Sequence, residues 1–96
     1  MEDKYVKKCS LEEHTLNISE LIDIVANLKW SYYIKYHQEP RFIKLPIWVY
    51  TILKEYAHLI IGFYEIEKEG QTISIYMGMQ ICDTISIEDI EDIEVF

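Results

Sequence analysis

The sequence predicts an α+β fold in which two helices pack on one face of a mostly antiparallel sheet of about 4–5 strands. Apolar residues recur three or four positions apart over residues 18–37 and again over residues 45–56. This spacing is typical of helices that bury one face. Residues 59–82 are instead rich in isoleucine and aromatic residues and contain the turn Glu69-Gly70, which together indicate a β-hairpin.

The composition favours one folded domain that spans residues 1–96. Half of the 96 residues are hydrophobic, and the chain holds only three glycines and two prolines, which is unlike a disordered protein. No apolar run is long enough to span a membrane, and the start Met1-Glu2-Asp3-Lys4 has no basic flank leading into an apolar stretch. We therefore expect a soluble, cytoplasmic protein with no membrane partner. Cys9 and Cys82 are expected to be free, buried thiols.

The strongest helical signal runs from about Ile18 to His37. The apolar face of this helix consists of Ile18, Leu21, Ile22, Val25, Leu28, Tyr32 and Tyr36. Asn17 is suited to cap the helix, and Glu20 stands three residues later, where a capping box places a glutamate. The sequence therefore predicts a capped helix of about five turns.

A strand over residues 42–45 and a second helix from Pro46 to about His58 follow. Pro40 ends the first helix, because the residue before a proline is disfavoured in the α region. A proline at position 46 suits the first helical turn, where its missing N–H costs nothing. These two elements connect the long helix to the sheet.

The second half of the chain predicts most of the sheet. Residues 59–67 and 71–77 form the hairpin, Gly78 marks a bulge or a bend, and residues 79–82 continue as a strand. A further edge strand is expected at Lys4–Cys9. The core that the helices share with the hairpin should include Leu21, Val25, Leu28, Trp48, Ile52, Ile73 and Ile75.

The end of the chain combines isoleucines with acids. Ile87, Ile90 and Ile93 are three residues apart, which allows one helical turn with Ser86 as its cap before residues 94–96 close as a strand. If the isoleucines point inward, the carboxylates between them are forced outward as one fixed cluster. This predicted acidic cluster consists of Glu88, Asp89, Glu91, Asp92 and Glu94.

The net charge of −8 is concentrated in the last third of the chain. Residues 1–64 contain eight acids and eight bases, whereas residues 65–96 contain nine acids and the single base Lys68. An acidic segment repels nucleic acid and anionic lipid and attracts a basic protein surface. The acidic cluster is therefore a candidate contact for a protein partner; the alternative is that it only keeps a small domain soluble.

A second candidate contact lies on the long helix. Trp30, Tyr33 and His37 are three and four residues apart on a side that is not the apolar face, and exposed aromatics of this kind are typical of protein interfaces. We expect this side to bind a protein partner or a second copy in a homodimer. Nearby lysines suggest nucleic-acid binding as an alternative, but the first two thirds of the chain carry no net positive charge. No direct contact with nucleic acid is expected.

Catalytic signatures are missing from the sequence. The metal-binding residue types His14, His37, His58, Cys9 and Cys82 are never at the spacing of a zinc knuckle or of a helical i, i+4 pair. No nucleophile-elbow pattern and no glycine-rich phosphate loop is present. We expect a protein that is not an enzyme and that needs no metal or cofactor.

A set of apolar motifs points to a family. The motifs are Leu45-Pro46-x-Trp48-x-Tyr50-x-x-Leu53, Ile75-Tyr76-x-Gly78-Met79-x-Ile81 and Ile93-Glu94-Val95-Phe96. In these motifs, over roughly residues 40–96, the chain resembles small proteins encoded in phages and prophages of low-GC Gram-positive bacteria. The resemblance implies a role as a virion component or as an accessory factor that acts on bacterial defence systems.

The residues and the resemblance together lead to two expected functions. The first is an anti-CRISPR-like inhibitor of a bacterial defence complex, such as a CRISPR nuclease, whose acidic cluster blocks a basic nucleic-acid-binding surface. The alternative is a virion assembly or capsid-associated structural protein.

Overall fold

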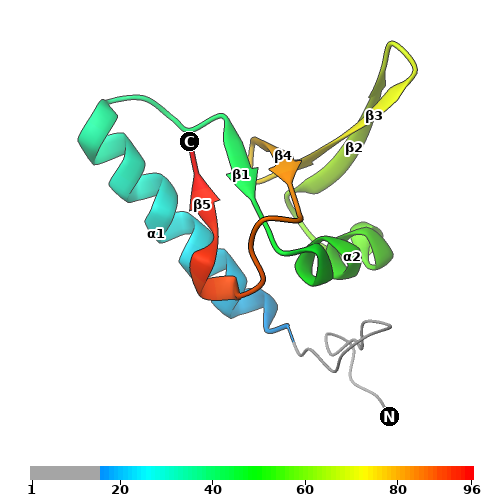
Figure 1. Ribbon diagram of the computed structural model, residues 1–96, viewed down its shortest axis with the longest axis horizontal. Coiled ribbons are helices and arrows are strands. Elements are labelled where there is room, and N and C mark those ends of the chain that lie inside the picture. Colours follow the sequence, from blue (N-terminus) through cyan, green and yellow to red (C-terminus); the bar gives the residue numbers. More distant parts are fainter. Residues whose placement is uncertain (1–15) are drawn as a thin grey trace.

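A computed structural model describes residues 16–96 and shows an α+β fold (Figure 1). The predicted strand at Lys4–Cys9 lies outside the described residues. The elements in chain order are α1 (Ile18–Tyr36), β1 (Phe42–Lys44), α2 (Ile47–Glu55), a 3₁₀ turn (Ala57–Leu59), β2 (Phe63–Lys68), β3 (Gln71–Tyr76), β4 (Met79–Asp83), a second 3₁₀ turn (Ile90–Asp92) and β5 (Glu94–Val95).

The five strands form one sheet in the order β2-β3-β4-β1-β5. β1 and β4 pair in parallel, and the other pairs are antiparallel. This arrangement confirms the predicted fold class. It also places β1, which precedes all the other strands in the chain, between β4 and β5.

α1 begins at the predicted residue and ends one residue early. The backbone N–H of Glu20 donates to Asn17 Oδ1 at 3.1 Å, so Asn17 caps the helix as expected. His37 takes a left-handed conformation with φ 58° and donates its N–H to the Tyr33 carbonyl at 2.7 Å. His37 is therefore the C-cap of α1.

α2 is shorter than predicted. Pro46 has the extended conformation of an N-cap, with φ −61° and ψ 151°, so the helix starts after the proline. It ends at Glu55, and a separate 3₁₀ turn occupies residues 57–59. As a result β2 starts at Phe63, four residues later than the sequence predicted.

Two tight turns fix the register of the β2–β3–β4 meander. Glu69 and Gly70 have φ values of 54° and 81°, and Met77 and Gly78 have values of 51° and 84°. Two successive positive φ values are typical of a type I′ hairpin turn. Gly78 is therefore part of a bend, which was one of the two expected alternatives, and β3 ends at Tyr76.

The core lies between the two helices and one face of the sheet. Its fully buried residues include Leu21 and Val25 from α1 and Val49, Ile52 and Leu53 from α2. Leu28 and Trp48, which were also predicted to be buried, are half-buried and pack against this core.

The prediction that Ile73 and Ile75 belong to the core is wrong. Ser74 and Tyr76 are 5% and 0% exposed and face the helices, while the two isoleucines are half-buried on the opposite face. Alternation along a strand fixes two faces but not which of them is covered. Here the register places Tyr76 opposite both Phe63 and Met79, so the large buried side chains gather on the face of Tyr76.

Candidate protein-binding surfaces

The acidic loop, defined as residues 84–93 between β4 and β5, is ordered at its start by Asp83. Asp83 Oδ1 accepts the backbone N–H groups of Ile85 at 2.9 Å and Ser86 at 3.2 Å, and Oδ2 accepts the Ser86 hydroxyl at 2.8 Å. The Ile85 N–H, followed by the Ser86 hydroxyl, lowers the pKa of Asp83 below its ordinary value. Ser86 is thus engaged by Asp83 and does not cap the 3₁₀ turn, which contradicts the predicted cap.

Apolar side chains hold the acidic loop against the core. Ile93 is only 4% exposed, and Ile87 and Ile90 are half-buried against the core cluster. Trp48 adds a hydrogen bond between α2 and the loop, because its indole Nε1–H donates to the Glu88 carbonyl at 2.9 Å. The predicted inward direction of the isoleucines is confirmed. The loop is therefore fixed from α2 as well as from its own side chains.

The structure divides the predicted acidic cluster into two parts. All five acids are exposed and line an open hollow of about 580 Å³, but Glu88, Asp89, Glu91 and Asp92 form no ion pair with another described residue. Glu94 lies in β5 opposite Lys44, and their side chains are 3.7 Å apart. Four carboxylates are therefore available to a partner, whereas the fifth is already paired.

The predicted aromatic side of α1 is exposed. Trp30 and Tyr33 are 63% and 44% exposed, and their rings stack with centroids 6.1 Å apart. Next to these rings, Lys29 Nζ donates to the Met77 carbonyl at 2.8 Å. This hydrogen bond connects α1 to the β3–β4 turn. His37, the third predicted residue, is exposed at the C-cap of the helix.

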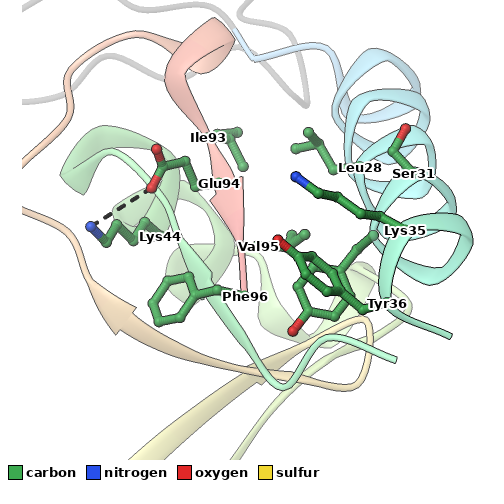
Figure 2. A pocket seen from close by; sticks show the side chains of 10 residues that line it. Leu28, Ser31, Lys35, Tyr36, Lys44, Ile93, Glu94, Val95 and Phe96 are labelled. Carbon is green, nitrogen blue, oxygen red and sulfur yellow. Dashed lines mark ion pairs between the residues drawn. The ribbon is translucent and has the colours of Figure 1, made fainter. Parts of the chain in front are cut away.

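A third surface, a groove between α1 and β5, was not predicted. It has a volume of about 530 Å³, and Figure 2 shows Lys35 reaching from α1 towards β5 across it. Residues 28–36 of α1 and residues 93–96 supply most of the lining. No local pattern reveals this groove, because pairing of β5 with β1 is what brings its two walls together.

Among residues 16–96, no group of three or more His, Cys, Asp or Glu side chains is placed to hold a metal ion.

Cys82 is a free thiol on the exposed surface. Its predicted burial is wrong: β1 pairs Ile43 with Ile81 and Lys44 with Asp83, so Cys82 is the extra residue at an irregularity of β4 and is exposed. No described helix is long and apolar enough to cross a membrane.

Comparison of the chain with protein families, with curated proteins and with solved structures finds no match. Inference about function therefore depends on the surfaces of the molecule.

Proposed function

We propose that the protein binds another protein through the acidic loop and inhibits a bacterial defence complex, such as a CRISPR nuclease, by occupying its basic nucleic-acid channel. The observation that carries this proposal is the attachment of the loop. Four exposed carboxylates stand on a backbone segment that Ile93 and the Trp48 indole hold against the core. The backbone that carries the four carboxylates is therefore ordered before binding.

A fixed set of carboxylates is suited to compete with nucleic acid. A nucleic-acid channel holds phosphates with lysine and arginine side chains, and these form charge-assisted hydrogen bonds with carboxylates as well. A segment that is ordered before binding loses less conformational entropy than a mobile acidic tail. Negative charge on a loop that is already ordered therefore favours binding to a basic channel.

The choice of a bacterial defence complex depends on the resemblance to phage proteins that the sequence motifs suggest. Those motifs include core positions such as Leu53, Tyr76 and Met79, so the resemblance concerns the packing of the fold. The acidic loop adds the surface through which an inhibitor of that architecture would act.

The proposal is tested by reversing Glu88, Asp89, Glu91 and Asp92 together to Lys. The partner is first captured from a lysate of a low-GC Gram-positive host, and its affinity for the protein is then measured over a range of salt concentrations with and without duplex DNA. We expect the unchanged protein to lose affinity as salt rises and to be displaced by DNA. The reversed variant should lose binding, because like charges then meet across the contact.

A charge-matched control distinguishes the effect of the acidic loop on affinity from the effect of the net charge of the protein. The control reverses four exposed acids outside the loop, which are Glu20, Asp23, Glu39 and Glu69. It should keep most of the affinity and the salt dependence. Equal affinity of the loop-reversed variant and the unchanged protein, with the same salt slope, would show that the acidic loop is only a solubilising surface.

A second candidate function, virion assembly or capsid association, is supported by the stacked and exposed rings of Trp30 and Tyr33. Aromatic residues of this kind anchor contacts between proteins, including contacts between copies. Self-association that is insensitive to salt, or co-sedimentation with capsids, would favour this candidate over the inhibitor.

A further inference from the structure

β2 forms one edge of the sheet and has an open backbone. It pairs with β3 along its inner side and is the first strand in the order of the sheet. Met77 N–H donates to the Gly62 carbonyl at 2.9 Å, and hydrogen-bonded pairs alternate with non-hydrogen-bonded pairs along an antiparallel ladder. The N–H and C=O groups of Glu65 and Glu67 therefore point away from β3, towards the outer side of β2.

The two faces of this edge differ in chemistry. On the helix-free face, Tyr64 lies opposite Ile75 and Ile66 lies opposite Ile73. Tyr64 and Ile66 are 53% and 42% exposed, so an apolar ladder is open to solvent. On the other face, Glu65 and Glu67 carry negative charge beside the same open backbone.

A second copy of the chain is a poor occupant for this edge. Two β2 strands related by a two-fold axis would pair antiparallel. In the two registers that overlap most residues with matching faces, Glu65 lies opposite Glu65 or Glu67 of the second copy. Like charges directly opposite each other destabilise a strand pair. Pairing of β2 with β2 of a second copy is therefore unfavourable, and β2 favours a partner strand with positively charged side chains.

We propose that β2 binds an extended segment of a partner protein in which apolar residues alternate with lysine or arginine. The segment adds to the sheet as a further strand and pairs with the outward backbone groups of Glu65 and Glu67. Its basic side chains lie opposite the two glutamates, and its apolar side chains extend the ladder of Tyr64 and Ile66. This site is separate from the acidic loop, because the loop leads into β5, and β2 and β5 lie at opposite edges of the sheet (Figure 1).

The one ion pair described at this face leaves Glu67 without a counter-ion. Glu65 accepts the Ser74 hydroxyl at 3.2 Å and lies 3.8 Å from Lys54 Nζ. Glu67 accepts the Thr72 hydroxyl at 3.0 Å and forms no ion pair with another described residue. Neutral hydroxyls hold the two carboxylates in place; Glu65 shares its charge with Lys54, and the charge of Glu67 has no described counter-ion.

The first test uses three fluorescent peptides and the full-length protein. The probe is a short peptide of alternating lysine and valine. One control peptide has the same composition in separate blocks, and the other alternates glutamate with valine. We expect the alternating lysine peptide to bind about tenfold more tightly than the block peptide, and the glutamate peptide to show no binding. Equal affinities for the two lysine peptides would overturn strand addition.

The second test measures amide hydrogen exchange in the unchanged protein with saturating probe peptide. The outward amides of Glu65 and Glu67 should gain protection, whereas those of Tyr64 and Ile66 already face β3 and should change little. A lack of added protection at Glu65 and Glu67 would mean that the glutamates serve only to keep copies of the chain apart.

Two substitutions of Glu67 distinguish the contribution of backbone pairing to peptide binding from the contribution of charge. Glu67→Pro removes the outward N–H, which an edge strand tolerates, and should abolish peptide binding. Glu67→Gln removes the charge but keeps the N–H and should weaken binding only a few-fold. Circular dichroism establishes that Glu67→Pro is folded; if it is not, the exchange measurement on the unchanged protein decides. The loop-reversed variant should bind the peptide normally, so this inference can fail or succeed independently of the proposed inhibition.

Discussion

The acidic loop and the β2–β3 hairpin both carry negative charge, but the fold holds them in different ways. The loop has only a short 3₁₀ turn, and side chains hold it, namely the isoleucines and the Trp48 indole. The hairpin is held by its own backbone ladder and by the tight turn at Glu69-Gly70, and it contributes few residues to the core. Charge can thus be positioned by apolar anchors or by backbone pairing, and the two regions should respond differently to mutation.

The largest expected effect comes from removing the main anchor of the loop. Ile93→Ala truncates a side chain that is 4% exposed and should lower the free energy of unfolding by about 2–5 kcal/mol. Ile85→Ala is the matched control, because Ile85 is 87% exposed and should change stability by less than about 0.5 kcal/mol. Urea denaturation measures both. Similar values for the two variants would show that the loop is not anchored through its isoleucines.

Tyr76, the hairpin residue at the centre of the core, should make stability fall at high pH. Its hydroxyl is buried with no hydrogen-bond partner among the described residues, and desolvation raises its pKa from 10.0 to about 12. The folded state therefore favours the neutral phenol. The contribution is fully present below pH 10, and about 2 kcal/mol of stability is lost as pH rises to about 12.

Urea denaturation between pH 9 and pH 12 checks this effect. Tyr76→Phe should flatten the decline relative to the unchanged protein, whereas Tyr64→Phe, which removes an exposed hydroxyl on β2, should leave the decline as it is. A decline that persists in Tyr76→Phe would assign the pH dependence to other groups.

A smaller effect on stability is expected from loss of the hydrogen bond between Trp48 of α2 and the acidic loop. Trp48→Phe keeps an aromatic ring but removes the donor to the Glu88 carbonyl, and should cost about 0.5–1.5 kcal/mol. Amide exchange should accelerate in residues 86–92 and stay unchanged in the hairpin. Uniform acceleration across the molecule would mean that the loop and the hairpin do not behave as separately held regions.

The smallest effect on stability is expected on α1, outside both regions. Changing Trp30 and Tyr33 together to Ser removes exposed rings and should shift the free energy of unfolding by no more than about 0.5 kcal/mol. Association with a partner or a second copy through this side should nevertheless be lost, as sedimentation velocity would show. A large loss of stability would instead make the two rings part of the core.

Local signals predicted α1 well, whereas α2 is shorter than predicted. The Asn17 cap and the three-to-four spacing lie within α1 itself, so its bounds followed to within one residue. The turn at Glu69-Gly70 was predicted for the same reason, because the conformation it requires is a property of those two residues.

Features that depend on distant pairing were predicted poorly. The covered face of β3 depends on Tyr76 meeting Phe63 and Met79, which alternation alone does not reveal. The isoleucine spacing did predict an anchored acidic segment. It did not reveal that Glu94 is paired with Lys44, because that contact joins residues fifty positions apart. The groove between α1 and β5 was missed for the same reason.

The central position of β1 has a consequence for the order of folding. β1 pairs with β4 and β5, whose residues follow it by about 40 to 50 positions, while β2, β3 and β4 are joined by two-residue turns. Closing a long loop costs more chain entropy than closing a short one, and non-local pairing slows folding. We expect the meander to be structured in the folding transition state and β1 to dock late. The two edges of the finished sheet, β2 and β5, would then belong to the earliest and the latest parts of the structure to form.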